Sequence, residues 1–315
     1  MISTPAIRGS THNENHSYFT ANKLVLQTRE QLDINKTLSS GQSFRWTKNE
    51  DGSWLGSIEG DRYLFRQLPD DGNGSVIEYE TSSTGNNERR IKKFFDLDCR
   101  YSEIFDTFRD DPFLSPAMKA HAGLRVLTQD PWETMISFIL STASNIPRIK
   151  GSIERLCASY GTKRKDMFGE YYDFPSAEKL ASASEDDFKK LGFGYRAPYV
   201  LNTSIIIAED PEFISSIATM SYENGKRKLC ELPGVGEKVA DCVLLFSFGF
   251  GESFPVDTWI LKVLKKYYQA DKPKTGVSQS ISAKKAAEFG RNRFGKYAGV
   301  VQQFMFEYGR ELNLK

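Results

Sequence analysis

The chain has 315 residues, of which 39% are hydrophobic and 26% charged, and its 42 basic and 41 acidic side chains leave a net charge of +1. This composition is typical of a globular protein of about two domains, and it excludes a disordered or collagen-like chain. No apolar run approaches the ~18 residues that a membrane-spanning helix needs, so we expect no membrane association.

The number and placement of the cysteines and histidines exclude further classes of protein. The polar first 16 residues lack the apolar stretch of a signal peptide, and the four cysteines are scattered, so we expect a reducing compartment without a disulfide framework. The expected location is the cytoplasm, or the nucleus in a eukaryote. Two of the three histidines lie in the polar tail, which argues against a histidine-based triad or zinc site.

The first part of the chain predicts an antiparallel β-sheet. After the polar tail at 1–16, short runs rich in aromatic and branched residues are separated by turn clusters. These runs are residues 43–49, 53–60, 62–68 and 75–82. Their spacing is typical of a twisted meander with one buried face.

From about residue 89 the apolar spacing becomes helical and stays so to the C-terminus. Asp130 is a good N-cap with Pro131 at the first helical position, and Gly161 stops the next helix. Further helical segments are expected at 184–192, 197–210, 223–232, 237–248, 257–268, 282–294 and 298–312. The fold class is therefore α+β, with an N-terminal antiparallel sheet domain at 17–118 and an all-helical domain at 119–315.

The segment 226–260 is the most informative for function. A helix is expected to end near Leu232, and a new helix begins after the turn Pro233, Gly234, Val235 and Gly236. Glycine permits positive φ and close approach of a ligand to the backbone, and free N–H groups at a helix N-terminus form an anion site. This pattern predicts a helix-hairpin-helix at about 222–249 that binds a nucleic-acid backbone. The alternative is a tight turn between two packed helices.

Two residues in this segment could carry chemistry. Lys238 lies in the first helical turn, where the helix dipole disfavours a cation and so favours the neutral amine of a nucleophile. Asp257 ends the loop at 250–257 and is expected to cap the next helix, which would fix its carboxylate and keep it ionised. A lysine nucleophile beside a carboxylate suits attack on a sugar carbon that develops cationic character. The alternatives are a phosphate-contacting surface lysine and a purely structural cap.

The segment resembles a known family. LPGVGEKVAD at 232–241, followed by PVD at 255–257, is similar to the helix-hairpin-helix DNA glycosylases with a Gly/Pro-Asp loop. Within them the chain resembles the 8-oxoguanine DNA glycosylases of the eukaryotic type. The similarity covers nearly the whole chain from about residue 20. Further matching stretches, in the same order, are SGQSFRW at 40–46, QDPWETMISFI at 129–139, RIKGSIERLCASYG at 148–161, LGFGYRAPYV at 191–200 and YAGVVQQFMF at 297–306.

The resemblance implies a bifunctional glycosylase and AP lyase that excises 8-oxoguanine from duplex DNA in base excision repair. Lys238 matches the lysine that attacks the anomeric carbon, and Asp257 matches the aspartate that stabilises that centre. Cys242 and Phe306 match the residues that sandwich the extruded base, and Gln302 matches the one that reads its Watson–Crick edge. Gly41 matches the glycine whose carbonyl accepts the N7 hydrogen, which only the oxidised base has. No cofactor and no catalytic metal are expected.

The resemblance also implies contacts to the DNA. Tyr195 resembles the wedge beside the vacated stack, and Arg148 and Arg196 resemble the pair that contacts the orphaned cytosine. The hairpin residues Gly234, Val235 and Gly236 would meet the backbone. The carbonyls of Cys230, Leu232 and Val235 match those that hold a structural cation. We expect a monomer that binds double-stranded DNA containing an oxidised purine.

The chain departs from the family pattern at two places. Ala143 and Ser144 stand where the family commonly has asparagines, one of which fills the space opposite the lesion, so discrimination of the opposite base is expected to be weaker. Trp259 stands where a phosphate-contacting histidine is frequent, and indole cannot be cationic.

Other functions fit the sequence less well. A non-catalytic helix-hairpin-helix protein would need neither Lys238 nor Asp257, and a monofunctional alkyl-base glycosylase would lack the lysine. No cysteine follows Cys242, which excludes an iron–sulfur glycosylase. A lysine-dependent glycosylase acting on other damaged bases remains the alternative within the class.

Overall fold

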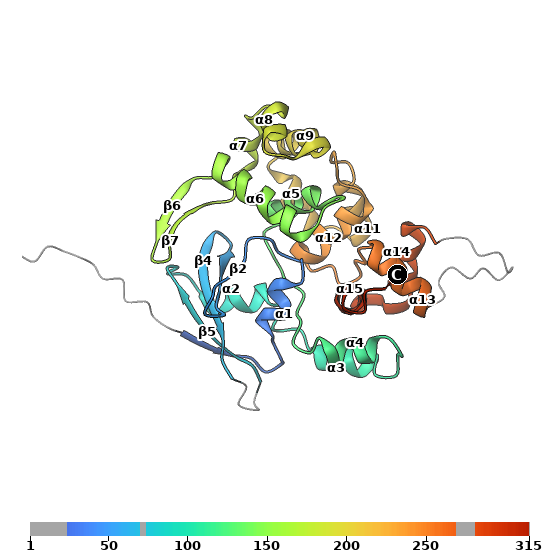
Figure 1. The fold of residues 1–315 in the computed structure, drawn as a ribbon. Coiled ribbons are helices and arrows are strands. Elements are labelled where there is room, and N and C mark those ends of the chain that lie inside the picture. Colours follow the sequence, from blue (N-terminus) through green and yellow to red (C-terminus); the bar gives the residue numbers. More distant parts are fainter. Residues whose placement is uncertain (1–23, 70–73, 269–280, 315) are drawn as a thin grey trace, which may run out of the picture.

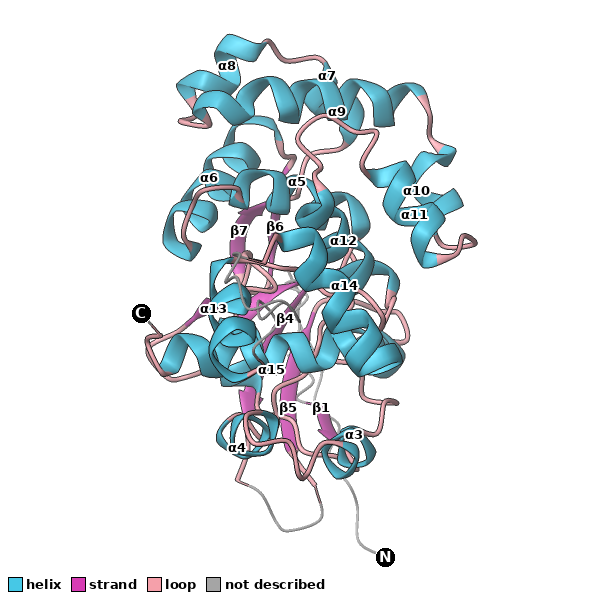
Figure 2. Ribbon diagram, turned by 90° about the vertical axis from the view of Figure 1, so that its right-hand side faces the viewer, coloured by secondary structure: helices cyan, strands magenta, loops and turns pink. Residues whose placement is uncertain are grey.

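The computed structural model describes residues 24–69, 74–268 and 281–314, so the polar tail expected at 1–16 lies outside the described residues. The sheet-containing part and the helical body lie side by side (Figure 1). Figure 2 shows α7 to α9 at one end of the molecule and α3 and α4 at the other, with α12 to α15 in front of the sheet. No helix within these ranges is long and apolar enough to cross a membrane.

The predicted meander is confirmed as the main part of a five-stranded antiparallel sheet. The strand order is β1-β5-β4-β3-β2. The strands are β1 (Leu24–Gln27), β2 (Thr47–Lys48), β3 (Trp54–Ile58), β4 (Asp61–Gln67) and β5 (Val76–Thr81). In β3, side chains alternate between buried and half-buried positions, as expected for a sheet with one face on the core. The edge strand β1 was not predicted, because it is only four residues long and pairs with β5, far along the chain.

Aromatic side chains fill the core between the sheet and α2 (Asn87–Phe94). Trp46 stacks on Phe65 of β4 at a ring distance of 5.3 Å and lies 5.5 Å from Phe94 of α2. Asn86 caps this helix, which begins close to the predicted change from strand to helical spacing. The short helix α1 (Ile34–Ser39) adds Ile34 and Leu38 to the same core.

The body of the molecule is helical, as predicted. Asp130 caps α5, Pro131 is its first residue, and Gly161 is the C-cap of α6. The helix before the hairpin ends at Leu229 rather than near Leu232, because the following residues form turns in which the Val235 N–H bonds to the Leu232 carbonyl. The helices are α5 (Pro131–Ser141), α6 (Ile146–Tyr160), α7 (Ala177–Ala181), α8 (Glu185–Lys190), α9 (Ala197–Glu209), α10 (Glu212–Ile217), α11 (Tyr222–Leu229), α12 (Glu237–Phe248), α13 (Thr258–Tyr267), α14 (Ala283–Phe294) and α15 (Ala298–Glu311).

One part of this body is not helical, contrary to the expectation that helical spacing continues without a break. Strands β6 (Lys163–Asp166) and β7 (Gly169–Tyr172) form an antiparallel hairpin that extends toward the five-stranded sheet (Figure 1). Asp166 forms a 3.0 Å ion pair with Arg62 of β4, and the Arg62 guanidinium lies 4.6 Å from the centre of the Tyr171 ring. These contacts to a distant strand, and not the local sequence pattern, explain why the segment is extended.

Helix α3 (Tyr101–Thr107) precedes the domain boundary expected at residue 118, whereas helix α4 (Leu114–Ala120) continues across it. Their buried residues belong to the large core of the helical body. Phe113 lies 5.4 Å from Tyr308 of α15, for example. The boundary at 118 stays a prediction.

Candidate active site

A cavity of about 1030 Å³ lies where the helix-hairpin-helix, the C-terminal helix and the loop before β2 meet. It brings together six of the predicted site residues from both ends of the chain. Its lining includes Gly41, Lys238, Cys242, Asp257, Gln302 and Phe306. Gly234 and Gly236 of the hairpin also line it. The geometry therefore gathers the expected nucleophile, carboxylate and base-binding residues around one space.

A buried ionic network fixes the hairpin that carries Lys238. Asp241 of α12 accepts hydrogen bonds from the Tyr222 hydroxyl at 2.6 Å and from Lys226 Nζ at 2.9 Å, both of α11. Arg291 of α14 donates to the same hydroxyl at 3.2 Å. Burial raises the pKa of Asp241, and the Lys226 charge opposes this shift. The network joins three helices, so the start of α12 is held in one orientation relative to the cavity.

Close packing shapes the turn of the hairpin. Gly234 has φ +78°, and a β-carbon there would lie 2.6 Å from Cβ of Tyr199, so only glycine fits. Gly236 is the N-cap of α12 and makes no side-chain capping bond, which leaves the first N–H groups of this helix available to an anion. Val235 is buried, and its N–H already bonds to Leu232 at 3.1 Å. Of the three predicted hairpin residues, Val235 is therefore the least available to DNA.

Lys238 is half-buried in the first turn of α12, on the wall of the cavity. Its Nζ lies 5.0 Å from the centre of the Phe138 ring, within the range of a cation–π contact. Phe138 in turn stacks on Phe246 at 5.5 Å and meets Phe44 edge-on at 5.6 Å. The Lys238 amine thus packs against a cluster of three aromatic rings, which the sequence motif did not predict.

Asp257 caps α13, as predicted, and accepts a 2.9 Å hydrogen bond from the Ile260 N–H. Burial raises the pKa of this carboxyl, while that hydrogen bond and the Lys238 charge act in the opposite direction. Capping favours the ionised form of Asp257, as expected, but burial of the carboxyl favours the protonated form and is the larger effect on its pKa. A carboxylate that is poorly solvated interacts more strongly with nearby positive charge.

Cys242 and Phe306 both line the cavity. Cys242 lies one turn after Lys238 in α12, and burial raises the pKa of its thiol to about 11, so it is neutral at physiological pH. The Arg310 guanidinium lies 5.3 Å from the centre of the Phe306 ring, and both residues belong to α15. A neutral sulfur and an aromatic ring are suited to stacking on a flat heterocycle.

Gly41 reaches the cavity because its neighbour anchors the loop before β2. The Gln42 side chain donates to the Arg125 carbonyl at 2.8 Å and accepts from the Leu127 N–H at 2.8 Å. Gly41 has φ +78°, and a β-carbon at this position would lie 3.0 Å from Cδ1 of Ile146. This loop is therefore held against the segment that leads into α5, and its glycine lies close to the start of α6.

Two adjacent glutamines of α15 line the cavity, although only Gln302 was predicted as a site residue. Both are buried: the exposed fraction is 5% for Gln302 and 3% for Gln303. The Oε1 of Gln302 and the Nε2 of Gln303 have no hydrogen-bond partner. A single-sequence pattern could not separate Gln303 from an ordinary helix residue.

Arg148 and Arg196 line a smaller cavity of about 380 Å³ next to the first, together with Ala143 and Ser144, which border both. Arg196 donates to the carbonyls of Thr142 at 2.8 Å and of Ala143 at 3.0 Å. Tyr195 is 53% exposed, and its hydroxyl donates to the Thr142 carbonyl at 3.1 Å. These side chains lie together beside the main cavity. Contact with the DNA strand opposite the lesion would require this placement.

The carbonyls of Cys230, Leu232 and Val235 belong to the turns between α11 and α12. Leu232 accepts one hydrogen bond from Val235, and a carbonyl oxygen has a second lone pair for a cation. Oxygen-only ligation from backbone suits a hard cation, so these residues fit the predicted structural ion. Trp259 lines the main cavity. Lys262 Nζ lies 4.6 Å from the centre of its ring, so a positive charge lies near the position where the resemblance implies a phosphate-contacting histidine.

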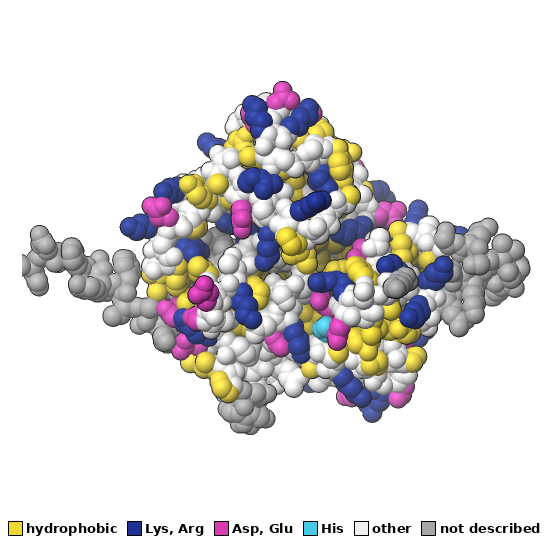
Figure 3. Space-filling view, in the orientation of Figure 1, with side chains coloured by type: hydrophobic (Ala, Val, Ile, Leu, Met, Phe, Trp, Pro, Cys, Tyr) yellow, Lys and Arg dark blue, Asp and Glu magenta, His cyan; other side chains and the backbone are white. Residues whose placement is uncertain are grey.

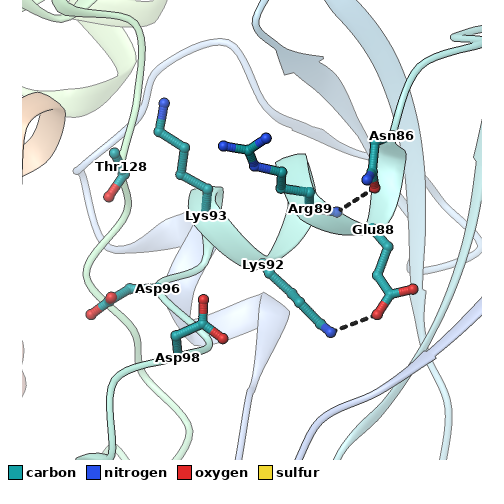
Figure 4. A pocket seen from close by; sticks show the side chains of 8 residues that line it. All are labelled: Asn86, Glu88, Arg89, Lys92, Lys93, Asp96, Asp98 and Thr128. Atoms are coloured by element: carbon teal, nitrogen blue, oxygen red, sulfur yellow. Dashed lines mark hydrogen bonds and ion pairs between the residues drawn. The ribbon is translucent and has the colours of Figure 1, made fainter.

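A third hollow lies on the surface of α2 (Figure 4). It is lined by charged and polar side chains, among them Lys92, Lys93, Asp96 and Asp98. Lys92 pairs with Glu88 on the same helix. Burial raises the pKa of Asp96 to about 6. The residues that line this hollow include no aromatic side chain on which a base could stack, so it does not compete with the cavity at Lys238.

Comparisons with known families agree with this arrangement. Residues 24–135 match the model of the N-terminal domain of 8-oxoguanine DNA glycosylase, and residues 136–287 match that of the HhH-GPD superfamily of base excision DNA repair proteins. The fold and the site thus define a helix-hairpin-helix DNA glycosylase.

Individual relatives narrow the family. The N-glycosylase/DNA lyase OGG1 of Arabidopsis thaliana is 32% identical over 285 residues, which cover 89% of this chain and 78% of the relative. The N-glycosylase/DNA lyase of Saccharomyces cerevisiae is 30% identical, over 90% of this chain and 85% of the relative. The chain belongs to the family of 8-oxoguanine N-glycosylase/DNA lyases.

A solved structure shows the same fold. The 8-oxoguanine glycosylase/lyase of Clostridium acetobutylicum, in complex with double-stranded DNA containing cytosine opposite 8-oxoG, superposes with a TM-score of 0.83 at 30% identity. The match covers 92% of this chain and 96% of that chain. A 3-methyladenine DNA glycosylase from Archaeoglobus fulgidus, at 17% identity and a TM-score of 0.70, shares the fold.

Proposed function

We infer that the protein is a bifunctional DNA glycosylase and AP lyase that removes 8-oxoguanine and related oxidised purines from duplex DNA. The observation that carries this conclusion is the single cavity in which Lys238, Asp257 and the base-binding residues meet. Family membership supplies the reaction class, and the cavity supplies a place for one extruded base. A base in a duplex cannot be reached otherwise, and flipping it costs a few kcal/mol.

In the proposed mechanism, Lys238 acts as the nucleophile. Its neutral amine attacks C1′ of the deoxyribose, and the bond from C1′ to the base nitrogen breaks with its electron pair leaving on the base. Asp257 faces the positive charge that develops on the sugar, and its carboxylate stabilises that charge. Loss of the amine proton and opening of the sugar give a Schiff base. Removal of a C2′ proton then expels the 3′ phosphate by β-elimination.

The base-binding residues would divide their tasks. Cys242 and Phe306 supply stacking, which is worth about 1–3 kcal/mol per base and is tolerant of base identity. The Gly41 carbonyl would accept the N7 hydrogen of the oxidised base, whereas guanine would present a lone pair there. Gln302 has an unpaired acceptor that suits the N1 hydrogen of 8-oxoguanine.

Double-stranded DNA is the proposed partner. In Figure 3 Lys and Arg side chains are spread across the face that carries α5, α6 and α13 to α15. Such charges bind the phosphate backbone without sequence preference. Arg148, Arg196 and Tyr195 would then contact the strand opposite the lesion. We also propose that the protein acts as a monomer, because every candidate group comes from one chain.

Borohydride trapping on a duplex with one 8-oxoguanine tests this function. The wild-type chain should form a covalent adduct and nick the lesion strand. Lys238→Gln keeps a polar side chain of similar length and should abolish both, while duplex affinity changes little. A Gln variant that still cross-links would refute the nucleophile, and binding without any excision by the wild type would favour a non-catalytic DNA-binding protein.

A further inference from the structure

We propose that Gln303 is a second specificity-determining residue of the base pocket, acting with Gln302 to select purines that carry a 6-oxo group. The proposal rests on the proposed function, since it concerns the extruded base. The observation behind it is a buried carboxamide that makes no hydrogen bond within the protein. Within the described ranges, only Gln302 and Gln303 have carboxamide atoms that are buried without a partner.

Such atoms are costly unless a ligand meets them. A buried donor or acceptor without a partner destabilises the fold, so each case calls for a functional or structural reason. Gln303 is 3% exposed and lines the same cavity as Gln302. Two adjacent cases on one cavity wall indicate that the partners arrive with the substrate.

Helix geometry places the two glutamines on either side of the base-stacking residue. At about 100° per residue, Phe306 lies about 40° from Gln302 in one direction around α15 and about 60° from Gln303 in the other. Phe306 stacks on the face of the base in the proposed site. The two carboxamides, one turn earlier, then approach its edge from both sides.

The unpaired atoms are complementary to one class of base edge. Gln302 offers an acceptor, Oε1, and Gln303 offers a donor, the N–H of Nε2. A 6-oxopurine presents a carbonyl acceptor at O6 beside a donor at N1, and a 6-aminopurine presents the reverse. Gln302 would therefore take the N1 hydrogen, and Gln303 would donate to O6. Stacking by Phe306 and Cys242 cannot make this distinction.

Single-turnover excision of 8-oxoguanine and 8-oxoadenine, each opposite cytosine, tests the assignment. Gln303→Leu removes the donor at similar size and should slow 8-oxoguanine excision about tenfold. The 8-oxoadenine rate should not fall, because the variant removes a donor that would face the N6 donor. The ratio of the two rates should therefore fall by at least the same factor. Gln303→Glu places an acceptor against O6 and should lower the ratio further.

Stability separates specificity from a structural role. Because the Nε2 of Gln303 is unpaired, Gln303→Leu should unfold at the same temperature as the wild type or a higher one. Gln67→Leu is the control: this carboxamide accepts from the Ile34 N–H at 3.1 Å in the sheet, so its loss should lower the unfolding temperature without changing the rate ratio. A rate ratio for Gln303→Leu within twofold of the wild type overturns the inference. Absence of 8-oxoguanine excision by the wild type would instead reject the proposed function.

Discussion

Asp257 combines a structural and a chemical role that one substitution separates. Asp257→Asn keeps an oxygen that can cap α13, so the free energy of unfolding should change by less than the ~0.5–2 kcal/mol that loss of a cap costs. The substitution removes the charge that faces the sugar, and single-turnover excision should slow by about a hundredfold or more. A folded Asn variant with near-normal turnover would leave only the capping role.

Burial of this carboxyl also predicts a pH dependence. Since burial raises the pKa of Asp257, its ionised form is lost at a higher pH than that of an exposed aspartate. In a pH profile of single-turnover excision, we expect the rate to fall on acidification at a higher pH than an exposed aspartate would give. The Asp257→Asn variant should not show this fall.

Ala143 stands at a position where the resemblance to the 8-oxoguanine DNA glycosylases implies an asparagine. It has φ +48°, a left-handed conformation that alanine adopts at a cost and asparagine tolerates. A methyl group cannot hydrogen-bond a base on the opposite strand. We therefore predict that wild-type excision depends only weakly on the base opposite 8-oxoguanine, and that Ala143→Asn strengthens this dependence without loss of stability.

The measurement compares excision opposite cytosine and opposite adenine. Rates that already differ by about a hundredfold in the wild type would contradict the prediction. They would mean that Arg148 and Arg196 suffice for discrimination. In that case release of Arg196 from the carbonyls of Thr142 and Ala143 would have to accompany DNA binding.

At the scale of an element, α15 carries the stacking residue and a titratable neighbour. Burial raises the pKa of Glu307 to about 7, although its partner Arg310, at 2.9 Å, opposes the shift. The folded chain thus holds a proton that the unfolded chain releases. The associated stability is fully present below about pH 4.5 and is lost as the pH rises through about 7.

Glu307→Gln removes this titration and gives a direct test. We expect wild type and variant to have similar free energies of unfolding near pH 5. At pH 8 the variant should be the more stable, in urea titrations followed by circular dichroism. Equal pH dependence of the two proteins would show that Glu307 is not the group responsible.

At the scale of the whole molecule, the hairpin β6–β7 ties the helical body to the sheet. The link is the Arg62–Asp166 pair, whose side chains are 10% and 8% exposed. Breaking a buried pair by removing one partner leaves an unpaired charge. Arg62→Met should therefore lower the free energy of unfolding by about 3–5 kcal/mol.

The matched control removes both charges. In Arg62→Met combined with Asp166→Leu, no buried charge is left, and stability should return toward that of the wild type. A double variant as unstable as the single one would mean that the stacking of Arg62 on Tyr171, and not the ion pair, holds the hairpin.

Local sequence determined much of this protein. Alternating apolar residues specified β3 to β5, and the caps Asp130 and Asp257 specified where α5 and α13 begin. These features depend on a few neighbouring residues, so periodicity and capping chemistry were enough. The residues quoted for the resemblance also predicted the family.

Only the tertiary structure decided how distant segments combine. It joined Gly41 to a cavity whose other walls come from α12 and α15, and it made β6–β7 extended through Arg62. It also buried Asp257, so that its pKa rises, and left Gln303 unpaired beside Gln302. Burial, desolvation and missing hydrogen-bond partners depend on what the rest of the chain brings to a residue, and the residue's own neighbours in sequence do not encode them.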